Sequence, residues 1–183
     1  MTNKQIKQAS KLALKKDRWM PVLVTFVYSL IVMYVPIFLT GTLSIGVFNY
    51  YTKSLNGEKK SFEDLFSGFK LFGKSLGTLL LILLYTFLWS LIPFAGPFIS
   101  YVKNYSYSLS LLLLKDNPEM SANEAITKSR ELMDGKKWQR FCLDLSFIGW
   151  HILDMFTCGL LGILYVVPYK QFSVIKFYEE LKK

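Results

Sequence analysis

Three ionisable side chains, Asp144, His151 and Asp154, lie in an otherwise apolar stretch near the C-terminus. Their spacings of seven and three residues place them within about 80° of one face if the stretch is one continuous α-helix. Histidine titrates near neutral pH, and a carboxylate can accept its proton or bind a cationic ligand. The trio is therefore a candidate proton relay or ligand-binding site. The alternative is a structural role, in which these groups form hydrogen bonds between helices.

A second apolar stretch carries a polar strip that includes Asn104, Tyr105, Tyr107 and a nearby basic residue, Lys103. Polar side chains in membrane helices either pack helices together or line a cavity, and both interpretations remain open. We include Lys103 and Tyr105 with the trio, so the candidate set is Asp144, His151, Asp154, Lys103 and Tyr105.

Other kinds of chemistry have no support in the sequence. It contains no glycine-rich phosphate loop, no HExxH and no CxxC. Cys142 and Cys158 lie 16 residues apart on one expected helix, about 24 Å, which is too far for a disulfide. One histidine and two separated cysteines do not make a zinc site. We expect no enzymatic activity, catalytic residue, cofactor or bound metal.

Stretches of the sequence without charged residues indicate which helices carry these candidate residues. Positions 19–52 and 75–102 contain no charged residue, 34 and 28 positions respectively, and a third apolar region spans 141–177. A membrane-spanning helix needs roughly 20 apolar residues, so each region suits a hairpin of two helices. The sequence predicts an all-α, polytopic membrane protein with about six transmembrane helices as three hairpins. The expected spans are 20–38, 41–55, 75–92, 97–115, 139–156 and 160–178, of which 41–55 is the weakest and could be re-entrant.

The three hairpins have similar internal spacing. The residue after each basic helix entry (Trp19, Ser75 and Trp138) is followed 21 or 22 positions later by a glycine expected in the turn (Gly41, Gly96 and Gly159). A short amphipathic stretch precedes each hairpin, at 6–14, 62–72 and 122–133. We therefore expect a helical hairpin repeat within a single integral membrane domain, 1–183, with units at about 1–55, 56–120 and 121–183. The amphipathic stretches are expected to be cytoplasmic interfacial helices, in the headgroup region or over the cytoplasmic mouth of the bundle.

The loop 116–124 has the signals of a helix start. Ser121 or Asn123 is suited to cap the helix, Glu124 suits its positive end, and Gly135 is placed to end it.

The distribution of charge predicts orientation. The chain has 22 Lys and Arg against 13 Asp and Glu, a net charge of +9, and 52% of its residues are hydrophobic. In the six-span arrangement, 21 of the 22 basic residues fall on one side and only Lys103 lies toward the other. Basic loops stay cytoplasmic. We expect a multi-pass protein of the bacterial cytoplasmic membrane with both termini cytoplasmic, in contact with the bilayer and with anionic lipid headgroups. Nucleic acid is not an expected partner, because the aromatic residues lie within the apolar spans.

Several segments carry a more specific pattern. They are SFEDLFSGF, LWSLIPFAGP, ANEAITKSRELMDG and the long C-terminal run SFIGWHILDMFTCGLLGILYVVPYKQFSVIKFYEEL. The pattern resembles a family of uncharacterised integral membrane proteins, mostly from Firmicutes, classed as a domain of unknown function. The chain departs from it at 95–97, where Pro-Gly is commoner, and at 158–160, where Gly-Ile-Gly is commoner. The resemblance implies a bacterial cytoplasmic-membrane protein of about six helices, and it implies no activity, substrate or catalytic residue.

Two functions remain in view. The first is a non-enzymatic binding or transport-accessory protein for a lipid, peptide or small solute, with the candidate set lining its cavity. The second is a membrane interaction protein, such as an immunity factor or a subunit of a larger membrane complex, without transport activity. A homo-oligomer or a membrane protein partner is compatible with either.

Overall fold

The computed structural model describes residues 2–16, 19–34, 37–59, 61–157 and 159–182, and these ranges contain helices and no strand. The expectation of an all-α fold is confirmed. The helices in chain order are α1 (Asn3–Lys16), α2 (Trp19–Tyr34), α3 (Ile37–Asn56), the 3-10 helix η1 (Phe62–Leu71), α4 (Phe72–Ser90), α5 (Gly96–Tyr107), α6 (Ser110–Asp116), α7 (Ala122–Leu132), α8 (Lys137–Leu145), α9 (Ile148–Phe156), the π-helix η2 (Gly162–Val166) and α10 (Val167–Leu181).

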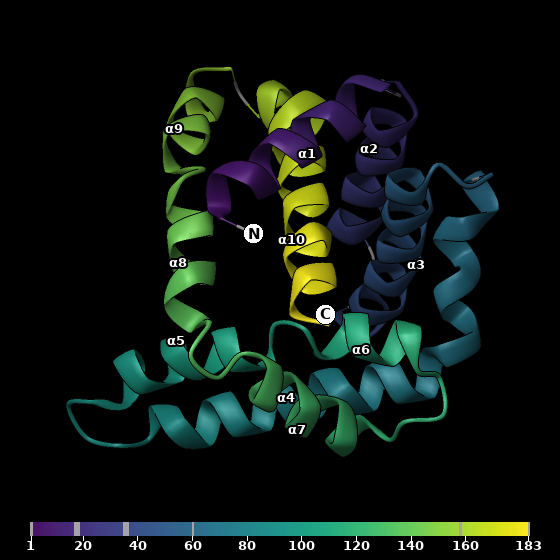
Figure 1. The fold of residues 1–183 in the computed structure, drawn as a ribbon. Coiled ribbons are helices and arrows are strands. Elements are labelled where there is room, and N and C mark those ends of the chain that lie inside the picture. The colour runs from purple at the N-terminus through teal and green to yellow at the C-terminus, as the bar shows by residue number, and fades with distance from the viewer. Residues whose placement is uncertain (1, 17–18, 35–36, 60, 158, 183) are drawn as a thin grey trace.

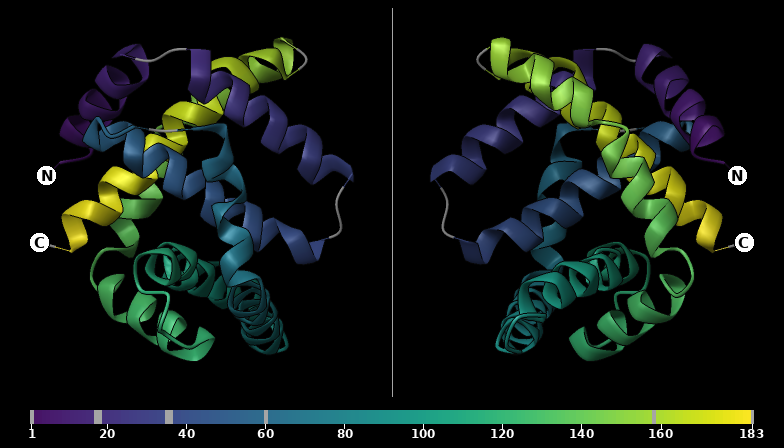
Figure 2. Two further views of the ribbon diagram at one scale, coloured as in Figure 1. Left: turned by 90° about the vertical axis from the view of Figure 1, so that its right-hand side faces the viewer. Right: turned by 90° about the vertical axis from the view of Figure 1, so that its left-hand side faces the viewer.

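The core lies around α10, which runs through the middle of the molecule with α1 crossing it (Figure 1). The rings of Phe172 and Phe177 on α10 are fully buried, and Phe172 packs edge-on against Tyr51 of α3 with centroids 4.7 Å apart. The start of α1 and the end of α10 lie on the same side of the molecule (Figure 2). The C-terminal segment is therefore the element on which α1, α2 and α3 assemble.

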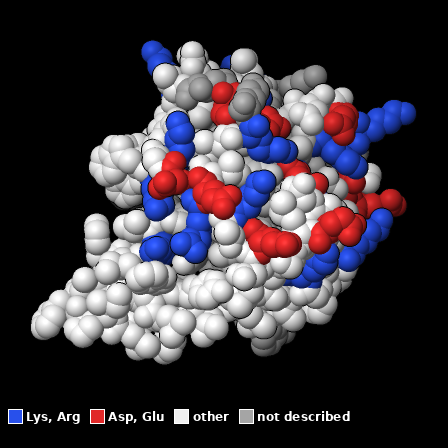
Figure 3. Space-filling view, turned by 60° about the horizontal axis from the view of Figure 1, so that its bottom comes forward, with Lys and Arg blue, Asp and Glu red and all other residues white. Residues whose placement is uncertain are grey.

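The hairpin of α4 and α5 lies across one end of the molecule, beyond the ends of α8 and α10 (Figures 1 and 2). Its turn, 91–95, is where the sequence predicts one, and it places Phe94 fully exposed with a φ of 61°. Positive φ is uncommon for a residue with a side chain. A space-filling view shows a continuous uncharged area at the lower left of the molecule, whereas Lys, Arg, Asp and Glu gather above it (Figure 3). Most of the hairpin, residues 75–102, contains no charged residue.

One helical stretch of the described residues, Phe62–Ser90 with 29 residues, is long and apolar enough to cross a membrane. A single helix of this kind is weak support for a membrane location. Crossing by six helices, like the orientation of the termini, therefore stays a prediction.

The first predicted turn is wrong in its position. We expected Gly41 to lie in a turn between spans 20–38 and 41–55, but α3 begins at Ile37 and contains Gly41. We also expected Pro36 in this turn, and it lies outside the described residues. A Cβ at Gly41 would come within 2.6 Å of the Leu79 side chain and 3.3 Å of the Ser75 carbonyl oxygen. Glycine at this position allows α3 to pack closely against α4. Because a turn also favours glycine, the sequence alone does not distinguish the two roles.

Two later spans are broken where we expected continuous helices. Span 97–115 divides into α5 and α6, and span 139–156 divides into α8 and α9, whereas span 160–178 continues without a gap from η2 into α10. At the first break, the Leu109 N–H donates to Ser129 Oγ at 3.2 Å, and the Ser129 hydroxyl donates to the Ser106 carbonyl at 2.7 Å. A serine from α7 thus satisfies backbone groups that the broken helix leaves unpaired.

The start of α7 follows its sequence signals. The Ser121 N–H donates to Glu124 Oε2 at 2.8 Å, and the Glu124 N–H donates to Ser121 Oγ at 3.3 Å. This reciprocal pair is a capping box, and Ser121 rather than Asn123 is the cap. Gly135 has a φ of +65°, as expected of a glycine that ends a helix.

The segment SFEDLFSGF docks η1 closely against α3. Leu65 is buried, and a Cβ added at Gly46 would lie 1.8 Å from the Leu65 carbonyl oxygen. Asp64 pairs with Lys53 at 2.7 Å and accepts the Ser61 N–H at 2.9 Å. The four phenylalanines of this region point outward and are exposed: Phe62, Phe66, Phe69 and Phe72. We expected Leu65 and these four phenylalanines to share the apolar face of the amphipathic stretch, and of the five only Leu65 is buried.

Candidate functional site

A cleft of about 220 Å³ lies between α5 and α8, and we call it the α5–α8 cleft. Its walls are Tyr101, Asn104, Tyr105, Ser108, Arg140 and Asp144. The spacing of Tyr101, Asn104 and Tyr105 places them on one face of α5, Ser108 directly follows that helix, and Arg140 and Asp144 are one turn apart on α8. Two residues of the polar strip noticed in the sequence, Asn104 and Tyr105, therefore belong to one wall of a cavity.

Arg140 is the most deeply buried charged residue of the cleft, with 7% of its surface exposed. Its Nη2 lies 3.8 Å from Asp144 Oδ2, a loose ion pair, and its guanidinium carbon lies 6.0 Å from the Phe177 ring centre. Neither Nε nor Nη1 has a hydrogen-bond partner among the described residues. Buried polar groups are normally paired, so donors without a partner call for an explanation.

Asp144 is held between two cations. Its Oδ1 lies 3.2 Å from Lys170 Nζ on α10, close enough for an ion pair although this oxygen forms no hydrogen bond within the described residues. Arg140 and Lys170 carry two positive charges against the single negative charge of Asp144. The cleft and its border therefore have a net charge of about +1 at neutral pH.

Aromatic rings extend from the cleft along α5 and α8. The hydroxyls of Tyr101 and Tyr105 lie 3.3 Å apart, and their rings meet edge-on at 5.4 Å. Tyr105 also meets Phe141 edge-on at 6.2 Å, and Trp138 stacks on Phe141 at 5.3 Å. Tyr101 is about half exposed and stands at the entrance of the cleft.

Of the residues predicted from the sequence, Asp144 and Tyr105 line the α5–α8 cleft. Lys103, on another face of α5, lies over the Trp89 ring with its Nζ 4.4 Å from the ring centre. It lines a separate depression with Arg130 and Lys137. Lys103 is thus positioned apart from the other predicted residues.

His151 and Asp154 also lie outside the cleft. The expectation that they share one helix face with Asp144 assumed an unbroken helix, and the break at 146–147 makes that assumption wrong. His151 is exposed. Asp154 Oδ1 accepts the Gly162 N–H at 2.5 Å, so this carboxylate caps the start of η2 across the turn. Cys158, which precedes the expected turn glycine Gly159, lies outside the described residues.

Sequence reasoning missed Arg140 as a site residue. We treated it as one of several basic residues at the inner surface, because nothing in its neighbours along the chain marks it as buried. The available signal was the four-residue spacing from Arg140 to Asp144, which places a cation and an anion on one helix face.

An apolar groove of about 320 Å³ lies along α4 and borders α5. Its walls are Leu76, Leu79, Leu80, Ile82 and Leu83, with Thr40, Thr86 and Asn104. Asn104 lines both the groove and the α5–α8 cleft. A polar cavity and an apolar one therefore share a wall.

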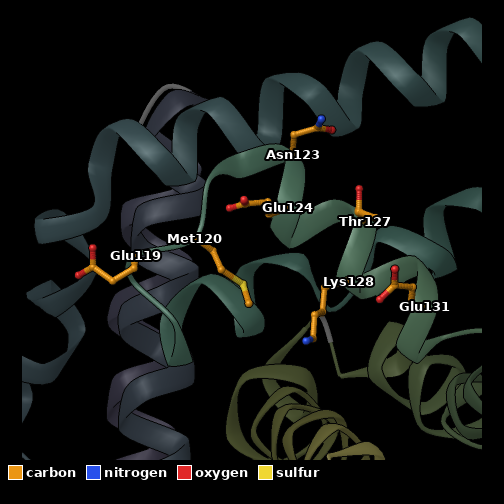
Figure 4. A pocket seen from close by; sticks show the side chains of 7 residues that line it. All are labelled: Glu119, Met120, Asn123, Glu124, Thr127, Lys128 and Glu131. Carbon is orange, nitrogen blue, oxygen red and sulfur yellow. The ribbon is translucent and has the colours of Figure 1, made fainter.

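A larger depression, about 520 Å³, lies over α7 (Figure 4). Glu119, Glu124 and Glu131 are spread along it with Lys128, and their carboxylates do not converge (Figure 4). Hydrogen bonds from Ser121 hold the pKa of Glu124 below its usual value, because this carboxylate belongs to the capping box. No group of acidic, histidine or cysteine side chains suited to a metal ion occurs in the described ranges.

Comparison with known proteins gives one finding. Residues 95–183, just under half of the chain, match the family described as "Protein of unknown function (DUF975)". The matched part contains α5 to α10 and hence every residue of the α5–α8 cleft. No curated protein and no solved structure matches the chain. The bacterial source and the membrane location implied by the sequence resemblance stay predictions.

Proposed function

We propose that this chain is an integral membrane protein that binds a ligand in the α5–α8 cleft without chemically changing it, as a binding or transport-accessory protein. The observation that carries the proposal is the exposed apolar surface of the α4–α5 hairpin within residues 75–102, where no charged residue occurs. Ten large apolar side chains are exposed there: Leu80, Leu83, Leu84, Phe87, Leu88, Leu91, Ile92, Phe94, Phe98 and Tyr101.

The free energy of this surface favours lipid over water. Burying a large apolar side chain is worth about 1.5–3 kcal/mol, so ten half-exposed ones represent on the order of 10 kcal/mol. A water-soluble monomer rarely exposes a continuous apolar patch of this kind. A bilayer core would satisfy it without a protein partner, and α4 with η1 is long enough to cross one.

The distribution of charge supports the same placement. No charged residue occurs from 75 to 102, whereas the loop and helix from 115 to 140 contain six basic residues. We propose that α7 faces the cytoplasm of a bacterial cell together with both termini, where its cations contact anionic headgroups.

Cysteine labelling tests this topology. In a background of Cys142→Ser and Cys158→Ser, we would compare Phe94→Cys at the α4–α5 turn with Asn123→Cys on α7. A membrane-impermeant maleimide should label Phe94→Cys in intact cells and Asn123→Cys only after permeabilisation. The protein should also stay in the pellet when membranes are washed with alkaline carbonate.

Release by alkaline carbonate, or labelling of both positions in intact cells, would contradict membrane insertion in this orientation. A protein released in complex with a second chain would instead assign the apolar surface to a membrane interaction partner.

A further inference from the structure

Arg140 is the starting point, because it is a buried cation whose hydrogen bonds are incomplete. Nε and Nη1 together carry three of the five guanidinium N–H donors, and no described residue accepts from them. The nearest carboxylate oxygen, at 3.8 Å, is beyond hydrogen-bonding distance from Nη2. A buried guanidinium in this condition is poorly paired within the chain itself and is positioned to bind an anion from outside.

The shape and charge of the cleft specify that anion. A planar guanidinium matches an oxyanion with two or more oxygens, phosphate above all. The net charge of about +1 set by Arg140, Lys170 and Asp144 is balanced by one negative charge, which is the charge of a phosphodiester. Asp144 can accept a hydrogen bond from a hydroxyl or ammonium next to that phosphate.

The surroundings of the cleft indicate what the phosphate is attached to. The apolar groove on α4 shares Asn104 with the cleft, so a molecule with a phosphate in the cleft can lay a hydrocarbon chain in the groove. Phe98 and Leu145 lie close in sequence to the cleft residues Tyr101 and Asp144, and both are exposed. A polar cavity joined to an apolar groove is complementary to an amphiphile.

We infer that the α5–α8 cleft is a phosphate-binding site in which Arg140 donates to a phosphodiester, supplied by a glycerophospholipid whose acyl chain occupies the groove beyond Asn104. The inference rests on the proposed membrane location for its lipid source, whereas the phosphate chemistry rests on Arg140 and the cleft. A free phosphate ion is the other possible source of the same group.

The test is native mass spectrometry of the full chain, purified in detergent and stripped of lipid. Dioleoylphosphatidylglycerol is the probe, and dioleoylglycerol, which has the same chains and no phosphate, is its control. We expect the wild type to retain one phosphatidylglycerol and not dioleoylglycerol. Arg140→Gln should weaken retention about ten- to a hundred-fold, as expected for loss of a hydrogen bond to a charged group.

Arg130→Gln is the matched control variant, because it removes the same charge from an exposed arginine of α7 that does not line the cleft. It should retain the lipid as the wild type does. Asn104→Leu is a second variant that leaves the guanidinium intact and changes only the exposed junction between cleft and groove. It should weaken lipid retention even if Arg140→Gln does not fold.

Inorganic phosphate distinguishes the two sources. If it raises the thermal unfolding midpoint of the wild type but not of Arg140→Gln, while lipid retention is independent of Arg140, the site takes the free ion. Equal retention of both lipids by wild type and Arg140→Gln, with no effect of inorganic phosphate, overturns the proposal.

Alkaline extraction of the same variants measures membrane insertion independently of lipid binding. Arg140→Gln that stays in the membrane without binding lipid leaves the proposed membrane location intact. A wild-type protein that is extracted from the membrane yet binds inorganic phosphate through Arg140 would reject the location and keep the phosphate site.

Discussion

At the scale of single residues, Ser129 stabilises a helix break that lies about 20 positions earlier in the chain. It accepts the Leu109 N–H and donates to the Ser106 carbonyl at the α5–α6 break. Ser129→Ala should lower the free energy of unfolding by about 1–3 kcal/mol, because a buried N–H loses its acceptor. Ser100→Ala, which removes only a bond within its own helix turn, should change it by less than about 0.5 kcal/mol. Unfolding by denaturant in detergent micelles would measure both, and equal effects would contradict this role.

Also at the scale of single residues, the surroundings of Asp116 lead us to predict that the stability of the protein depends on pH. Burial raises the pKa of its carboxyl, but hydrogen bonds from Lys182 at 2.6 Å and Tyr178 at 2.9 Å and the charge of Lys115 outweigh burial and lower it overall. The stabilisation is therefore complete above the ordinary pKa of about 3.9 and is lost as the pH falls through the lower pKa of the folded state.

Asp116→Asn should consequently be less stable than the wild type at pH 7, and the difference should shrink toward pH 3. The exposed Asp134→Asn serves as the control, with little difference from the wild type across this range. Thermal unfolding at several pH values measures the effect, and a constant difference between Asp116→Asn and wild type would show that the ion pairs are not its source.

At the scale of helices, the approach of η1 to α3 depends on Gly46. An added methyl group there would collide with the Leu65 backbone, and overpacking of this kind typically costs about 1–3 kcal/mol. Gly46→Ala should therefore destabilise the protein. Gly73→Ala, with nothing within 4 Å of its added Cβ, should stabilise it by up to about 1 kcal/mol through helix propensity. Denaturant midpoints of the two variants should shift in opposite directions, and a shared direction would contradict the close approach.

The helices also show which features a sequence carries and which it does not. The Ser121 cap and the Gly135 stop were predictable because both signals lie within a few residues of the helix end they define. Gly41 was misread because close packing and a turn select the same residue. The break between α5 and α6 depends on Ser129, and the burial of Arg140 depends on α5 and α10, so both follow from contacts between distant segments.

At the scale of the whole molecule, the α4–α5 hairpin presents its apolar side chains outward. In water, Leu84→Arg at an exposed position should be tolerated, but at the centre of a membrane span an arginine costs about 2.5–3.5 kcal/mol. We expect Leu84→Arg to reduce the amount of protein in the membrane fraction several-fold. Thr127→Arg, on the exposed face of α7, should leave that amount unchanged. Quantitative blotting of membrane fractions checks the pair, and equal accumulation would argue that the hairpin does not enter the lipid.

The stacked rings beside the cleft make Trp138 a natural fluorophore for it. The indole is 72% exposed, stacks on Phe141, and through that ring adjoins Tyr105 in the cleft wall. With Trp19, Trp89 and Trp150 replaced by phenylalanine, the remaining emission would come from this one indole. A shift in its wavelength during titration would then follow occupancy of the cleft in real time, with no dye attached to the protein.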